Sequence, residues 1–281
     1  MPAYNEGENI GDCLRDLKKT LAALPDKHEI IVVDDGSGDD TFNKACEAGA
    51  RVVQHKTNMG YGRSLKDGIS AASGEYIFLI DADGTYDMGK IPKMISMAGD
   101  ADLVVGKRVF SAASSHHIKN IARRFFAYQV SYYANTKIED LNSGQRIFRR
   151  QDVIDSLDRY PDGFSFTSTQ TVFYCLHNKR IVYTPVEYRH RGAGSKFLSR
   201  VNVMAMAKLS FRLTLFGRPL LLFAQLLGVI AAAAAISKMI GDSHGANAYY
   251  YIDSFIIFVP VLFFILLCYI YARGRAVVVR N

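Results

Sequence analysis

Cysteine is scarce in this sequence, and its placement excludes two classes of protein. The four cysteines, Cys13, Cys46, Cys175 and Cys268, are scattered along the 281 residues. They show neither the close spacing of a zinc site nor the density of a small disulfide-bonded domain. We therefore expect reduced thiols in a cytosolic protein whose length is sufficient for a hydrophobic core.

Carboxylates are missing from one long stretch. No Asp or Glu occurs between Glu187 and Asp242. Before the hydrophobic run begins, that stretch contains Arg189, Arg191, Lys196, Arg200, Lys208, Arg212 and Arg218. Because this basic segment leads directly into a hydrophobic run, it indicates anionic lipid head groups rather than nucleic acid as the partner.

Charge is missing altogether from two hydrophobic runs, Pro219–Ile236 and Phe255–Ala272. Each would measure about 27 Å as an α-helix, close to the ~30 Å hydrocarbon thickness of a bilayer. We predict two transmembrane helices at about 219–240 and 253–272; a very apolar helical hairpin used for dimerisation is the alternative. Since basic residues flank the pair on its outer sides, the positive-inside rule places both termini in the cytoplasm. The mixed pattern of 197–217 predicts amphipathic helices at the membrane interface.

The first part of the chain alternates strand and helix signals, which predicts a doubly wound, mostly parallel α/β sheet. The predicted strands are 29–33, 51–54, 76–80 and 103–105, and the predicted helices are 9–24, 41–48, 61–72 and 90–97. Residues 106–150 are basic, aromatic and helix-prone, and a helix at 169–178 and a strand at 181–183 follow. Ligands bind such sheets beyond the carboxyl ends of the strands, where Asp34, Asp35, Asp81 and Asp83 would lie.

Asp81-Ala82-Asp83 is the most informative triplet, because it follows the apolar strand Tyr76–Ile80 and precedes Gly84. An isolated triplet of this kind is common in turns. At the end of a buried strand, however, two carboxylates can converge on one hard cation. Mg²⁺ or Mn²⁺ accepts such ligands and leaves positions open for diphosphate oxygens.

Two further motifs precede this triplet, Pro2-Ala3-Tyr4-Asn5-Glu6 and Val32-Val33-Asp34-Asp35-Gly36-Ser37. With all three motifs in this order, residues 1 to about 200 resemble glycosyltransferase family 2 and its GT-A fold. Within the family, the chain is most similar to dolichyl- or undecaprenyl-phosphate sugar synthases. The resemblance implies an inverting transferase that moves one sugar from a UDP- or GDP-sugar to a polyprenyl phosphate, with Mg²⁺ or Mn²⁺. The sequence has no Trp, so the Q-x-x-R-W element of processive polysaccharide synthases is absent.

The resemblance also implies roles for individual residues. The residues expected to bind the nucleotide-sugar are Pro2, Tyr4, Glu6, Asp34, Asp35, Asp81 and Ala82, with Asp81 and Asp83 as metal ligands. The residues expected to contact phosphates or the acceptor are Arg108, Arg146, Arg189, Arg191, Ser195 and Lys196. Of these, Arg108 and Arg146, together with Asp83 and Asp140, are expected to serve catalysis. The implied organisation is a cytoplasmic GT-A domain at 1–196, interfacial helices at 197–217 and a two-helix anchor at 218–281.

Two other functions stay open from the sequence. A transferase of the same fold could act on a hydroxyl, which needs a general base; Asp140 is the candidate, although it could equally pair with a nearby Arg. A phosphomonoester, already ionised near neutral pH, needs little such help. A non-catalytic membrane scaffold with a degenerate GT-A domain is the third hypothesis, and a second copy of the chain is a further open partner.

The sequence departs from the family pattern at two places. Thr85 stands where related enzymes often have a metal-side ligand such as Gln. The chain also begins inside the Pro2–Glu6 motif, whereas relatives have an apolar strand just before it. We therefore expect Glu29–Val33 to be the first strand of this sequence.

Overall fold

The computed structural model describes residues 1–110, 127–128, 130–132, 136–163 and 165–188. All of them belong to one compact unit, Met1–Met206. Within the described residues, no helix is both long enough and apolar enough to cross a bilayer. The predicted interfacial segment at 197–217 and both predicted spans lie outside these residues.

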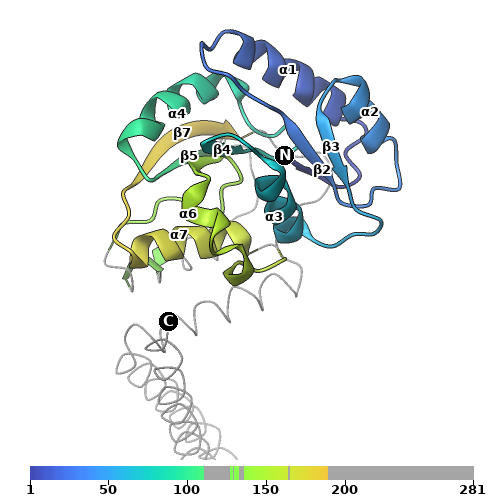
Figure 1. The fold of residues 1–281 in the computed structure, drawn as a ribbon. Coiled ribbons are helices and arrows are strands. Elements are labelled where there is room, and N and C mark those ends of the chain that lie inside the picture. The colour runs from blue at the N-terminus through green and yellow to red at the C-terminus, as the bar shows by residue number, and fades with distance from the viewer. Residues whose placement is uncertain (111–126, 129, 133–135, 164, 189–281) are drawn as a thin grey trace, which may run out of the picture. The chain divides into compact units, whose positions relative to one another are not determined.

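Strands and helices alternate along the described chain (Figure 1). The strands are β1 Pro2–Ala3, β2 Ile31–Asp34, β3 Arg51–Gln54, β4 Tyr76–Leu79, β5 Leu103–Phe110, β6 Arg146–Arg149 and β7 Ile181–Tyr188. The α-helices are α1 Ile10–Ala22, α2 Thr41–Glu47, α3 Tyr61–Ala71, α4 Ile91–Met97, α6 Gln151–Ile154 and α7 Phe166–Leu176. This alternation confirms the predicted α/β class.

The strands form a parallel three-stranded sheet, β1-β2-β3, and a four-stranded sheet of order β4-β6-β5-β7. In the second sheet β5 and β7 are parallel, whereas β6 runs antiparallel to both of its neighbours. The parallel pairing of β1 with β2 places Ala3 opposite Asp34. The Pro2–Glu6 motif therefore begins with a short strand, which the sequence did not predict.

Side chains of the second sheet alternate between two hydrophobic layers, as the pleat of a strand requires. Leu103, Val105 and Phe148 point into one layer, which α3 and α7 complete with Leu65, Ile69, Phe166 and Tyr174. Val104 and Ile147 point into the other layer, which α1 and α4 complete with Leu17, Leu21, Ile91 and Met94. In Figure 1, α1 and α4 accordingly lie on one side of the strands, with α3 and α7 on the other.

The structure corrects the prediction for residues 106–150. The sequence predicted a strand of 103–105 followed by helix-prone chain, but β5 continues to Phe110 and pairs with β7 along its whole length. β6 also lies in this region, at Arg146–Arg149. Both strands contain Arg residues, so their local signal is weak, and neighbouring strands supply the pairing that defines them.

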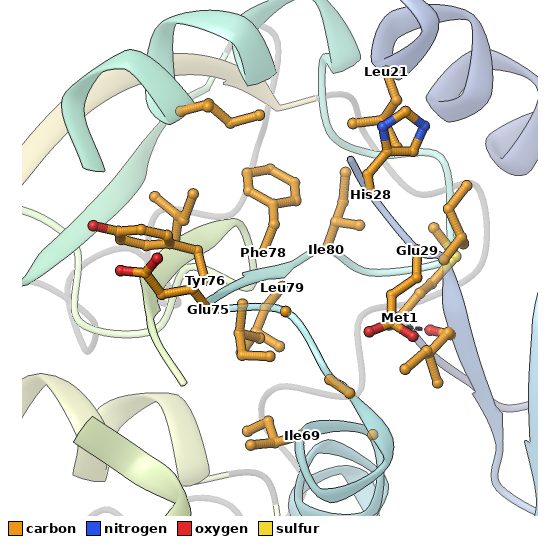
Figure 2. Close-up of a pocket in the computed structure, with 18 of the residues that line it drawn as sticks. Met1, Leu21, His28, Glu29, Ile69, Glu75, Tyr76, Phe78, Leu79 and Ile80 are labelled. Atoms are coloured by element: carbon orange, nitrogen blue, oxygen red, sulfur yellow. Dashed lines mark hydrogen bonds between the residues drawn. The ribbon is translucent and has the colours of Figure 1, made fainter. Parts of the chain in front are cut away.

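A cavity of about 770 Å³ lies between the two layers of helices. Its walls are mostly aliphatic and come from α1, α3, β2 and β4. Figure 2 shows Leu21 and Ile69 on opposite sides of the β4 residues Phe78 and Leu79. The acids that follow β2 and β4 do not line this cavity, so it is separate from the polar strand ends described below.

Candidate active site

The loops after β1 and β2 are joined by backbone hydrogen bonds to polar side chains. The Asn5 amide donates to Ser37 Oγ at 3.0 Å, and the Gly38 amide donates to Asn5 Oδ1 at 2.9 Å. The Glu6 amide donates to Thr41 Oγ1, and the Gly7 amide donates to Asp39 Oδ2, both at 2.9 Å. The first two predicted motifs therefore form a single structural unit at the carboxyl edge of the parallel strands.

Asp35 is a central acceptor of this unit and is only 4% exposed. Its oxygens accept hydrogen bonds from the Met59 amide at 2.8 Å and the Gly60 amide at 2.9 Å. His55 Nδ1 lies 2.7 Å from Asp35 Oδ1, and the other ring nitrogen lies 3.0 Å from Asp67 Oδ2. Asp35 thus fixes the loop that precedes α3.

Asp34 is fully buried and accepts from the Ser37 amide and from Gln54 Nε2, each at 3.2 Å. The sequence predicted that Asp34 or Asp35 would bind the base or ribose. In the structure both carboxylates accept hydrogen bonds from protein donors and hold the loops after β2 and β3.

Asp81 and Asp83 follow β4, and each carboxylate has its own hydrogen-bond donor. The Tyr61 hydroxyl donates to Asp81 Oδ1 at 2.9 Å. Asp83 Oδ1 accepts from the Thr85 amide at 3.1 Å and from Thr85 Oγ1 at 2.6 Å. Thr85 therefore orients one of the two acids.

Burial, together with the nearby charge of Asp83, raises the pKa of Asp81 to about 6. The two carboxylates therefore lie close enough to repel one another, and a cation shared between them would relieve that repulsion. Among the described residues no cluster of three or more His, Cys, Asp or Glu could hold a metal. This hard-oxygen pair fits a divalent cation that keeps most of its coordination positions for a substrate.

The turn that precedes β6 packs directly against Asp81. A Cβ atom at Gly144 would collide with Asp81 Oδ2. The Gly144 amide donates to the Tyr86 hydroxyl at 2.8 Å, and Ser143 Oγ donates to the Gly106 carbonyl at 2.6 Å. The acidic pair is thus backed by a turn that requires glycine.

Arg108 and Asp140 form a buried, two-pronged ion pair. Arg108 Nε lies 2.8 Å from Asp140 Oδ2, and Nη2 lies 2.7 Å from Oδ1. Their side chains are 8% and 11% exposed. Burial works to raise the pKa of Asp140, but the charge and hydrogen bonds of Arg108 outweigh it, so this pKa is lowered. Of the two roles left open for Asp140, base or arginine partner, the structure shows the partner.

Arg146 requires a correction, because the sequence predicted that it contacts phosphates. Its side chain is 0% exposed. The guanidinium donates to the Ser143 carbonyl, to the Thr167 carbonyl and to Gln170 Oε1, at 2.7–3.0 Å. Burial lowers its pKa. Arg146 therefore ties the turn before β6 to α7, and its guanidinium is not exposed for contact with a phosphate.

The other predicted residues occupy different positions around the site. Tyr4 is 37% exposed at the edge of the first loop, whereas Glu6 is buried and accepts from Asn9 Nδ2 at 3.2 Å. Ala82 is buried against Ala3, so its side chain belongs to the core. Pro2 lies in β1. Arg189, Arg191, Ser195 and Lys196 lie outside the described residues.

Several residues of the site were not predicted from the sequence, among them Tyr61, Tyr86, Gly144 and His55. Gly60 and Tyr61 carry a recognisable helix-start signal, but that signal does not show where the tyrosine hydroxyl points. The roles of all four of these site residues depend on contacts between elements that are far apart in sequence.

Comparison with known proteins identifies sequence relatives over most of the chain. It is 28% identical over 197 residues to the low-salt glycan biosynthesis hexosyltransferase Agl6 of Haloferax volcanii, covering 68% of this chain and 47% of the relative. It is 27% identical over 198 residues to a dolichyl-phosphate hexose transferase of the same organism, covering 70% and 84%. An undecaprenyl-phosphate 4-deoxy-4-formamido-L-arabinose transferase of Klebsiella pneumoniae is 26% identical over 220 residues, covering 73% and 64%. The chain therefore spans about half the length of the first of these relatives.

A solved structure shares the fold. Glucosyl-3-phosphoglycerate synthase from Mycobacterium tuberculosis, in complex with Mn²⁺, UDP and glucosyl-3-phosphoglycerate, superposes with a TM-score of 0.56 at 20% identity, covering 76% of each chain. Residues 1–157, more than half of the sequence, match the model of glycosyl transferase family 2. Because this match covers more than half of the sequence, it shows that the chain belongs to glycosyl transferase family 2.

Proposed function

We propose that this chain transfers one sugar, with inversion, from a UDP- or GDP-sugar to a polyprenyl phosphate. The observation that carries the proposal is the Asp81–Asp83 pair, two oriented carboxylates that follow a buried strand. Relatives named as dolichyl- and undecaprenyl-phosphate transferases support the same acceptor class.

Asp81 and Asp83 would hold Mg²⁺ or Mn²⁺, which when bound neutralises the charge that develops on a leaving nucleoside diphosphate. Thr85 and Tyr61 orient the two carboxylates for this purpose. Arg108 also belongs to the electrostatics of the site, since its positive charge partly offsets the rise in the pKa of Asp81 that burial and the charge of Asp83 cause. The sugar donor would enter between this pair and the joined loops after β1 and β2, near Tyr4.

The state of Asp140 favours phosphate over hydroxyl as the acceptor. A hydroxyl must lose a proton to a general base, but both Asp140 oxygens accept hydrogen bonds from Arg108. A phosphate oxygen is already a nucleophile near neutral pH. Because Asp140 is paired with Arg108, it is poorly suited to act as the general base that a hydroxyl acceptor needs.

We further propose that the enzyme is an integral membrane protein with its catalytic domain, 1–196, in the cytoplasm. Interfacial helices at 197–217 and an anchor at 218–281 would hold it at the bilayer, where a polyprenyl phosphate resides. The support is the pair of uncharged runs and the basic residues on their outer flanks.

The test is transfer of radiolabel from a panel of UDP- and GDP-sugars into undecaprenyl and dolichyl phosphate. We expect a metal-dependent, mild-acid-labile lipid product that Asp83→Ala abolishes. Asp158→Ala, which removes an exposed acid of the described surface, is the matched control and should retain activity. Transfer only to a hydroxyl lipid would support the alternative acceptor. A folded protein that binds no nucleotide in a thermal-shift titration would support the scaffold hypothesis, and transfer that persists in chelator would overturn the metal assignment.

A further inference from the structure

The Asp81 carboxylate is held from two sides by elements distant in sequence. On one side the Tyr61 hydroxyl donates to Oδ1 at 2.9 Å. On the other side Oδ2 lies against Gly144, at a position where a Cβ atom would collide with it. A carboxylate constrained at both oxygens has little freedom to rotate about its χ angles.

Tyr61 is itself firmly placed, because the start of α3 is packed against the loop at 161–163. A Cβ at Gly62 would lie 2.6 Å from the Gly163 carbonyl oxygen. The Arg63 amide donates to the Asp162 carbonyl at 2.9 Å. Gly60, which directly precedes Tyr61, has φ = +104°, a conformation that favours glycine. The first turn of α3 therefore has one position, and Tyr61 points from it to Asp81.

The opposite wall is equally fixed. The Gly144 amide donates to the Tyr86 hydroxyl at 2.8 Å, and Tyr86 is 4% exposed. The next residue but one, Arg146, is anchored to α7 through Gln170. The turn that contains Gly144 is therefore held in place beside the Asp81 carboxylate.

Asp83 is oriented differently, through a local contact. Its donor is Thr85, two residues further along the same turn. The orientation of Asp81 thus depends on Tyr61, and the orientation of Asp83 depends on Thr85. The Tyr61 contact comes from a separate helix, α3.

We infer that Tyr61 is a positioning residue that sets the orientation of Asp81 for cation binding. The inference rests on the proposed metal site and goes beyond it, because it assigns to a helix-start tyrosine the preorganisation of that site. Hydrogen-bond partners of metal-binding groups typically change metal affinity about 10–100-fold when they are removed.

The experiment is a Mn²⁺ titration of purified full-length protein, followed by electron paramagnetic resonance of the free ion. Tyr61→Phe should weaken Mn²⁺ binding about 10–100-fold and leave the melting temperature close to that of wild type. Tyr174→Phe is the matched control. Tyr174 is 1% exposed, and its hydroxyl has no hydrogen-bond partner in the described part of the chain, so its removal should leave Mn²⁺ affinity unchanged.

Gly144→Ala provides an independent test from the other side of the carboxylate, and it should weaken Mn²⁺ binding as well. If wild type binds no Mn²⁺, the proposed metal site itself fails. If wild type and folded Tyr61→Phe bind Mn²⁺ with the same affinity, the metal site stands and the positioning role of Tyr61 is overturned. Wild-type affinity in folded Gly144→Ala would contradict the constraint from the other side of the carboxylate.

Discussion

Arg108 Nη2 lies 2.7 Å from Asp140 Oδ1, and a second contact between the same two side chains makes the pair bidentate. This geometry changes the meaning of a substitution at Asp140. The change Asp140→Asn cannot test a general base alone, because it also removes the counter-charge of a buried guanidinium. Loss of activity in that variant therefore does not identify a hydroxyl acceptor.

Removal of Asp140 should destabilise the fold. Asp140→Ala leaves Arg108 buried without its partner, and breaking a buried pair in this way typically costs about 3–5 kcal/mol. Urea denaturation should show a lower midpoint with little change in slope. The double variant Arg108→Met, Asp140→Leu should recover much of the loss, since no unpaired charge is left. An unchanged midpoint in Asp140→Ala would contradict the buried-pair description.

The acidic pair should lower stability at neutral pH. The pKa of Asp81 rises from 3.8 to about 6 on folding. Between these two pH values the folded state therefore keeps a proton on Asp81 that the unfolded state has lost. The favourable contribution of Asp81 to the free energy of unfolding is fully present below pH 3.8 and is lost as pH rises through about 6.

In the absence of metal, Asp81→Asn should therefore raise stability at pH 7 by roughly 1–3 kcal/mol, and the gain should shrink toward pH 4. The measurement is thermal or urea unfolding of both proteins in chelator across this range. If the stability gain of Asp81→Asn grew as pH falls, the raised pKa of Asp81 would be contradicted.

Arg146 should matter for stability and not for substrate phosphate. Arg146→Met leaves the acceptors Ser143 O, Thr167 O and Gln170 Oε1 without their buried donor, so we expect a loss of about 2–5 kcal/mol. Arg159→Met, on the exposed surface, is the control and should change little. Donor KM, measured on the folded fraction, should stay near the wild-type value; a large rise in KM without loss of stability would restore the phosphate-contact prediction.

The turn after β2 should require glycine at one position and tolerate alanine nearby. Gly36 has φ = +72°, and a Cβ there would lie 2.6 Å from the Thr57 carbonyl carbon. Gly36→Ala should cost at least about 1–2 kcal/mol from the backbone conformation alone. Gly38→Ala meets no atom within 4 Å and should be nearly neutral. Equal melting temperatures for the two variants would show that the 57–58 backbone moves away freely.

Much of the sheet could be predicted from local pattern. Arg51–Gln54 is a strand with the bounds that the sequence predicted, and Tyr61–Ala71 is a helix that differs by one residue. The strand has two adjacent β-branched valines, and the helix has Leu65 and Ile69 at helical spacing. β6 and most of β5 were missed, because Arg146–Arg149 and the chain after Val105 carry charge that pairing with neighbouring strands overrides.

The sequence by itself determined the family, the α/β class and the acids that follow two strands, because order along the chain and period-two or helical patterning are written in it. Only the tertiary structure decided what each polar group contacts: Arg146 faces the core, Asp140 is bound to Arg108, and Tyr61 meets Asp81. The physical reason is that these contacts join residues 20 to 32 positions apart. Their partners are set by how helices and strands pack, a relationship that no local pattern contains.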